Sequence, residues 1–69
     1  QDYVRARHWF EKAAAQGLAA AQHGLGVLYN RGQGVTQDYA RARYWFEKAA
    51  AQGDSSAQSA LRLLQREGH

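Results

Sequence analysis

Few side chains in this 69-residue chain have the types and spacing that metal binding requires. The chain has three histidines, His8, His23 and His69, and no cysteine. Glu11 follows His8 by one helical turn, but a single His–Glu pair on a helix surface supplies fewer ligands than a zinc site uses. We therefore expect no metal site and no cofactor.

The serines are the other candidates for chemistry. Ser55, Ser56 and Ser59 are clustered near the start of a predicted helix. A serine nucleophile needs a neighbouring base, and no histidine stands at a related position. Capping of the helix N-terminus, by Asp54 or by one of the first two serines, explains this cluster better. The sequence therefore predicts a protein that is not an enzyme.

Two Arg-Ala-Arg strings, at 5–7 and 41–43, raise the possibility of nucleic-acid binding. The formal net charge of +3 is only mildly basic. In each string the second arginine is followed four residues later by a glutamate, Glu11 or Glu47, which is the spacing of ion pairs on a helix. The tryptophans that could stack on bases hold positions typical of a helix core. We therefore favour an ion-paired surface and expect no nucleic-acid partner.

The chain repeats itself with a period of 36 residues. When Gln1 is aligned with Gln37, 20 of 33 positions are identical, and 15 of these lie in the first 17. A fixed period of this length is typical of stacked supersecondary units. Each unit packs against its neighbours, and the stack usually presents a surface to partners.

Composition and the positions of helix-ending glycines predict that every element is a helix. Proline is absent, alanine is abundant and β-branched residues are rare. The expected helices cover about 2–16, 19–31, 38–52 and 55–66. Gly17 and Gly53 follow two of them, where a left-handed glycine ends a helix. Because the connections are short, consecutive helices should be antiparallel neighbours.

Apolar spacing predicts which side of each helix faces the core. The inward positions expected in the first helix are Tyr3, Ala6, Phe10, Ala13 and Ala14, and their counterparts 36 residues later should do the same in the third. Trp9 and Trp45 should flank these faces. In the second helix we expect a buried stripe of Ala21, Leu25 and Leu28. Gly26 lies inside that helix, and we interpret it as a site where another backbone comes close.

The segment 19–53, AAAQHGLGVLYNRGQGVTQDYARARYWFEKAAAQG, resembles the Sel-one-like repeat family, relatives of the tetratricopeptide repeats. The family pattern AxAQxxLGxxYxxGxGVxxDxxxAxxWxxxAAxxG is almost completely matched. The resemblance implies a right-handed α/α superhelix, or solenoid, that serves as a scaffold for protein–protein interaction. The chain would divide into the second helix of one repeat (1–17), one full repeat (18–53) and a terminal capping helix (54–69). We read it as a piece of a longer protein.

The proposed cap rests on two departures from the pattern. Arg62 stands in the place of Gly26, and Gln65 in the place of Tyr29. Polar residues at these packing positions are typical of the outer face of a terminal repeat.

We expect the chain to bind a protein or peptide partner along the first helix of each repeat. The candidate contact residues are Gln22, His23, Asn30 and Arg31, with Gln58, Ser59 and Arg62 in the next copy. An alternative is a structural repeat that self-assembles end to end through the apolar side of the first helix. A hydrolase is a further alternative, because some members of the resembled family have been given that label. No apolar run approaches the roughly 20 residues that cross a bilayer, so we expect no membrane span.

Overall fold

The structure, a computed structural model, describes residues 2–68 and contains helices and turns but no strand within that range. Its helices are α1 (Tyr3–Ala15), α2 (Ala19–Arg31), α3 (Tyr39–Ala51) and α4 (Ser55–Arg66). Each begins and ends within one residue of the bounds expected from sequence. The predicted all-α fold of antiparallel helices is therefore confirmed.

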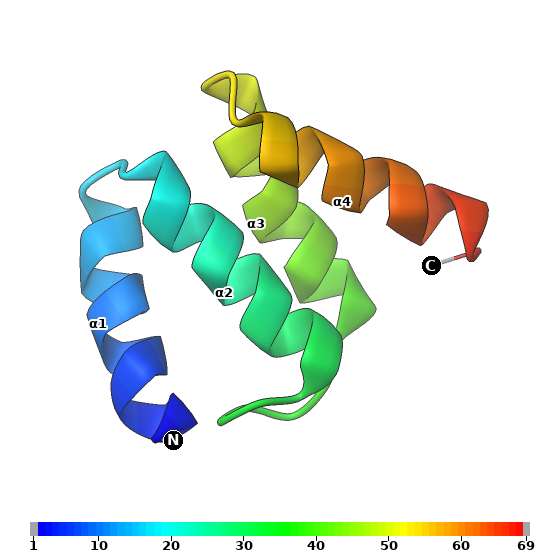
Figure 1. The fold of residues 1–69 in the computed structure, drawn as a ribbon. Coiled ribbons are helices and arrows are strands. Elements are labelled where there is room, and N and C mark those ends of the chain that lie inside the picture. Colours follow the sequence, from blue (N-terminus) through cyan, green and yellow to red (C-terminus); the bar gives the residue numbers. More distant parts are fainter. Residues whose placement is uncertain (1, 69) are drawn as a thin grey trace.

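The helices form a row in which each packs against the next (Figure 1). In Figure 1, α1 and α2 run antiparallel at one edge, α3 lies behind α2, and α4 crosses one end of α3. The molecule measures 30 × 24 × 17 Å. Its thickness is less than two helix diameters of about 10–12 Å each, so no residue is far from the surface and the core is thin.

Aspartate side chains fix the starts of three helices. Asp2, Asp38 and Asp54 each accept a hydrogen bond from a backbone N–H three residues later, at 3.1 Å. Asp54 rather than a serine therefore caps α4. Gly17 and Gly53 have φ values of 87° and 91°, the left-handed conformation predicted after α1 and α3.

The centre of the core is the ring of Phe46. Phe46 and Leu25 are the largest fully buried side chains of residues 2–68. A Cβ atom added to Gly26 would lie only 2.5 Å from the Phe46 ring, so α3 reaches α2 through this ring. The prediction that another backbone comes close to Gly26 is wrong, because the close neighbour is the Phe46 side chain.

A second contact of the same kind joins α1 to α2. A Cβ atom on Gly24 would lie 2.9 Å from the ring of Phe10. Phe10 is only half-buried, as are Tyr3 and Ala6, so the inward face predicted for α1 is partly open.

The prediction that both tryptophans flank the core is wrong for Trp9, whose side chain is 61% exposed. Its counterpart Trp45 is partly buried against a cluster that includes Ala14 and Leu25. The difference arises because α3 lies between two other helices, whereas α1 has a helix on one side only within residues 2–68.

We predict that Gly26→Ala destabilises the protein although alanine favours helix. Overpacking a filled core costs about 1–3 kcal/mol, which exceeds the roughly 1 kcal/mol that alanine gains over glycine in a helix. Gly24→Ala is the matched control, because the half-buried Phe10 ring can move away. Urea denaturation followed by circular dichroism should show a clear loss for the first variant and little change for the second. Equal stability of the two variants would contradict this account of Gly26.

Candidate partner-binding groove

The first helices of the two repeats, α2 and α4, enclose a cavity of about 240 Å³. It is lined by Val27, Asn30, Arg31, Phe46, Ala60, Leu63, Leu64 and Glu67. We call this cavity the α2/α4 groove. Its floor is the ring of Phe46, so the same side chain that joins α2 to α3 also supports the groove.

The α2/α4 groove combines an apolar interior with a polar rim. Phe46 and Leu64 are buried at its base, while the side chain of Leu63 is 50% exposed. Arg31 on α2 and Glu67, at the C-terminal end of α4, bring opposite charges to the rim. An apolar surface with a few placed polar groups is the usual character of a binding site.

The structure brings some of the predicted contact residues to this region. Asn30 and Arg31 line the groove itself. His23 lies on the same side of α2 but packs its ring against Phe46, with ring centroids 5.6 Å apart. Ser59 lies outside the groove and accepts a hydrogen bond of 3.2 Å from Arg62.

Gln22 is not available to a partner, which corrects its assignment as a contact residue. Its side chain is 4% exposed. Its Nε2 donates to the carbonyl of Ala14 at 3.3 Å, and its Oε1 accepts from Gln52 at 2.9 Å. Ala14 belongs to α1, and Gln52 is the residue that ends α3. Gln22, on α2, therefore connects three helices.

Gln58 repeats part of this arrangement. Its Nε2 donates to the carbonyl of Ala50 at 3.4 Å, 36 residues after the bond from Gln22 to Ala14. The sequence indicated this helix-joining role. Glutamine stands at both 22 and 58, although most other positions in this half of the repeat differ between the two copies. The groove residues that sequence reasoning missed are Val27, Ala60, Leu63 and Glu67, while Phe46 and Leu64 are core residues.

Arg62 also lies away from the groove. Arg62 is the counterpart of Gly26 one repeat later. Gly26 lies on the side of α2 that faces α3. On α4 the same side is exposed. Arg62 therefore lies on an exposed side of α4 that is not part of the groove.

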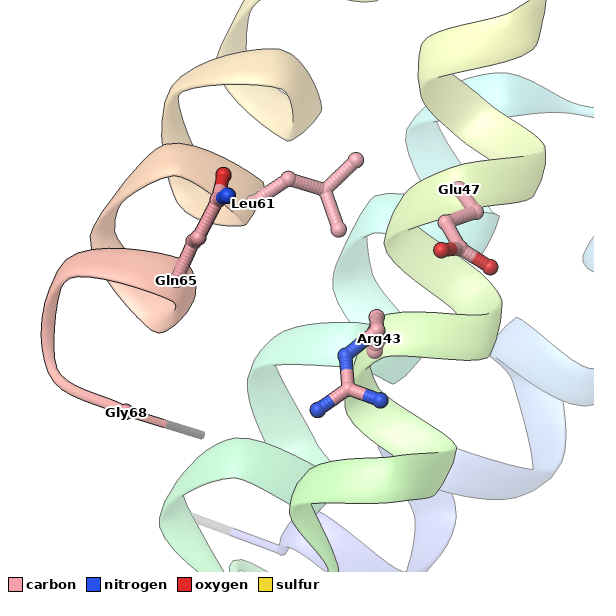
Figure 2. Close-up of a pocket in the computed structure, with 5 residues that line it drawn as sticks. All are labelled: Arg43, Glu47, Leu61, Gln65 and Gly68. Atoms are coloured by element: carbon pink, nitrogen blue, oxygen red, sulfur yellow. The ribbon is translucent and has the colours of Figure 1, made fainter.

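Another hollow, of about 480 Å³, lies between α3 and α4 (Figure 2). It is lined by Arg43, Glu47, Leu61, Gln65 and Gly68. Figure 2 shows Leu61 projecting from α4 toward α3. One repeat earlier, the counterparts Leu25 and Tyr29 pack with Trp45. The hollow therefore lies at the α3/α4 counterpart of that packed contact.

The arginines of the two Arg-Ala-Arg strings are largely paired with acids. Arg7 lies 3.2 Å from Glu11, which confirms that predicted ion pair. Arg5 and Arg41 each lie 3.6 Å from the aspartate that caps their helix. The argument against nucleic-acid binding also assumed that both tryptophans are buried. Trp9 is exposed, so that assumption is wrong for Trp9.

Within residues 2–68, no three histidine, aspartate or glutamate side chains lie close enough together to bind an ion. His69 lies outside the described residues. No helix in the described part of the chain is long and apolar enough to cross a membrane.

We predict that Gln22→Ala lowers the free energy of unfolding by about 1–3 kcal/mol, because it removes two hydrogen bonds of a buried side chain. Gln58→Ala should change it by less than about 0.5 kcal/mol, as expected for an exposed residue. Thermal denaturation of both variants measures the difference. Equal losses would show that Gln22 has no special role in joining the helices.

Comparison with known proteins places this geometry in a family. The model of the Sel1 repeat, the Sel-one-like repeat of the sequence resemblance, matches residues 1–18 and 19–54. The chain is also similar to a solved structure, the Sel1 repeat protein from Oxalobacter formigenes, with 38% sequence identity and a TM-score of 0.89. That similarity covers 94% of this chain but 27% of the other, so this chain spans little more than a quarter of that protein's length.

A search of curated proteins found no significant match. Sel1 repeats form a family of non-catalytic helical repeats that generally mediate protein–protein interactions. With most of its residues matched by the repeat model and its fold shared with a Sel1 repeat protein, this chain belongs to the Sel1 repeat family.

Proposed function

We propose that this chain binds a protein or peptide partner and that the partner occupies the α2/α4 groove. The observation that carries this proposal is the half-exposed Leu63 beside the apolar base of the groove. An exposed leucine on a rigid helix loses water when a partner side chain covers it, and that burial favours binding.

The rim of the groove supports recognition of a peptide rather than of a purely apolar ligand. Asn30 and Arg31 on α2 can donate hydrogen bonds, and Glu67 beside α4 can accept them. A segment that places an apolar side chain over Leu63 would bring its backbone close to these groups. The helices hold the three side chains on a fixed frame, so little ordering of the protein is required.

The proposed contact set differs from the one expected from sequence. It keeps Asn30 and Arg31 and adds Val27, Leu63 and Glu67. Gln22 and Gln58 are left out because they join helices, and Arg62 is left out because it lies on another side of α4. His23 and Ser59 are also left out, because they lie beside the groove rather than in it.

One groove of this size supports only weak binding. A stable protein–protein interface buries about 1,600 Å² in total, far more than a 240 Å³ cavity offers. We therefore propose that strong binding uses several consecutive repeats. The greater length of the Oxalobacter relative supports this view.

We further propose that the chain is a scaffold and not an enzyme. Among the serines, Ser59 is paired with Arg62 rather than with a general base, so its hydroxyl lacks the activation that nucleophilic catalysis requires. The non-catalytic character of the family supports the same view.

The groove is tested with peptides selected on this chain from a random library displayed on phage. We predict that Leu63→Ser weakens the binding of a selected peptide by about fivefold to tenfold, because half of a leucine side chain is no longer covered. Fluorescence anisotropy of the labelled peptide measures this loss. Amide signals of Val27, Asn30 and Arg31 should shift on binding in an NMR titration.

Leu18→Ser is the matched control, because Leu18 is 52% exposed and lies on the turn before α2, outside the groove. The peptide should bind this variant as it binds the unchanged chain. If both serine variants bind equally well, or if the shifted amides map to α1 and the far side of α3, the partner does not occupy the α2/α4 groove.

A further inference from the structure

The two walls of the α2/α4 groove carry opposite charges at equivalent positions of the repeat. Arg31 on α2 and Glu67 at the end of α4 are separated by the 36-residue period, and both line the groove. At every other aligned position where both copies are charged, as at Arg5 and Arg41, the charge has the same sign. An exact repeat would place like charges on the two walls, whereas this groove is positive on one wall and negative on the other.

Both charges are left unpaired by the residues that the structure describes. Arg31 and Glu67 are exposed, and within residues 2–68 neither side chain takes part in an ion pair or a hydrogen bond. Asn30, also on the rim, accepts a hydrogen bond from Gln37 through its backbone carbonyl, which leaves its side-chain amide unused. The rim therefore offers donors on α2 and an acceptor on α4 to a partner.

An apolar pair stands one helical turn before the two charges. Val27 and Leu63 precede Arg31 and Glu67 by four residues, a rise of about 6 Å along a helix, and residues four apart share a helix face. All four line the groove. The groove therefore presents two apolar side chains at one level and two opposite charges at the next.

The size of the groove determines how much of a partner enters it. Sites for drug-sized ligands span about 300–1,000 Å³, and the α2/α4 groove measures about 240 Å³. It therefore holds a single side chain of a partner segment. That side chain is apolar, because Val27, Leu63 and the ring of Phe46 surround it. The neighbouring residues of the segment lie on the rim, within reach of the two charges.

The rim charges then determine which neighbours are accepted. In an extended segment, alternate side chains face the same way. When the apolar residue points into the groove, the residues two before and two after it also face the protein. In a segment that crosses from one helix to the other, these two residues meet walls of opposite charge.

We propose that the α2/α4 groove selects a segment in which an apolar residue is flanked by one acidic and one basic residue, a proposal that rests on the peptide-binding function given above. The acidic residue lies against Arg31 and Asn30 on α2, and the basic residue lies against Glu67. A segment with two acids or two bases places one of them against a like charge, which disfavours the wrong partner.

The test uses a peptide selected on this chain from a random library displayed on phage. Loss of affinity for the Leu63→Ser variant identifies the peptide as a ligand of the groove. We expect its sequence to contain an apolar residue with an acid and a base near it. Selected groove ligands that lack either charge overturn the proposal.

Reversing one wall at a time tests each contact. Arg31→Glu makes both walls acidic and should weaken the selected peptide about threefold to fivefold, the range expected for exposed charges. Replacing the acid of the peptide by lysine should restore the affinity. Glu67→Arg makes both walls basic, and there replacing the base of the peptide by glutamate should restore it. Arginine also suits the C-terminal end of a helix, so this second variant keeps α4 intact.

Lys48→Glu and Glu47→Arg are the matched controls, because they change the net charge by the same amounts on α3, outside the groove. The three peptides should keep the order of affinity that they have for the unchanged chain. If the controls produce the same rescue, net charge rather than the rim decides binding, and the proposal is overturned.

Salt separates an effect of charge from a change of shape. At about 1 M salt, charges are screened beyond roughly 3 Å. The selected peptide should then bind the unchanged chain and the Arg31→Glu variant nearly equally, while Leu63→Ser remains weaker. A loss at Arg31→Glu that persists in high salt overturns the proposal.

Failure of this proposal is distinguishable from failure of the groove itself. If neither charge reversal alters binding but Leu63→Ser still does, the groove binds peptides without reading their charges. If Leu63→Ser has no effect on any selected peptide, the partner lies elsewhere and both proposals are wrong.

Discussion

The packing of one aromatic ring against a glycine sets the geometry of this protein. Phe46 lies so close to Gly26 that no Cβ atom fits between them. Alanines make up much of the remaining buried surface, so the helices approach closely and few large side chains fill the core. Because Phe46 also forms the floor of the α2/α4 groove, the contact that holds α3 to α2 also supports the candidate binding site.

A second layer of constraint comes from polar groups at the helix ends. Asp2, Asp38 and Asp54 fix where three helices begin. Gln22 bridges the ends of α1 and α3, so it helps to fix how the antiparallel helices meet. The caps at Asp2 and Asp38, and the bonds from Gln22 to Ala14 and from Gln58 to Ala50, recur with the 36-residue period, whereas the bond from Gln52 to Gln22 joins residues 30 apart.

The stacking of repeats gives the molecule two kinds of surface. Helices of the same type in successive repeats leave the α2/α4 groove between them, with Leu63 partly exposed. The two outer helices of the row, α1 and α4, each have an exposed side. At the α1 end this surface is aromatic and apolar, with Trp9 exposed, whereas on α4 it carries Arg62. The exposed side of α1 is therefore apolar where that of α4 is charged.

The sequence alone determined the helices, their bounds and their antiparallel order, because helix propensity and the capping aspartates and glycines act within a few residues of one another, and the repeat presents the same signals twice. It also indicated a close contact at Gly26, but wrongly assigned that contact to a backbone. Tertiary structure decided which side chains are exposed. Gln22 was expected at a binding surface and is buried, while Trp9 was expected at the core and is exposed. Leu63 was not singled out, because burial depends on which helices lie alongside, and those neighbours come from distant parts of the chain.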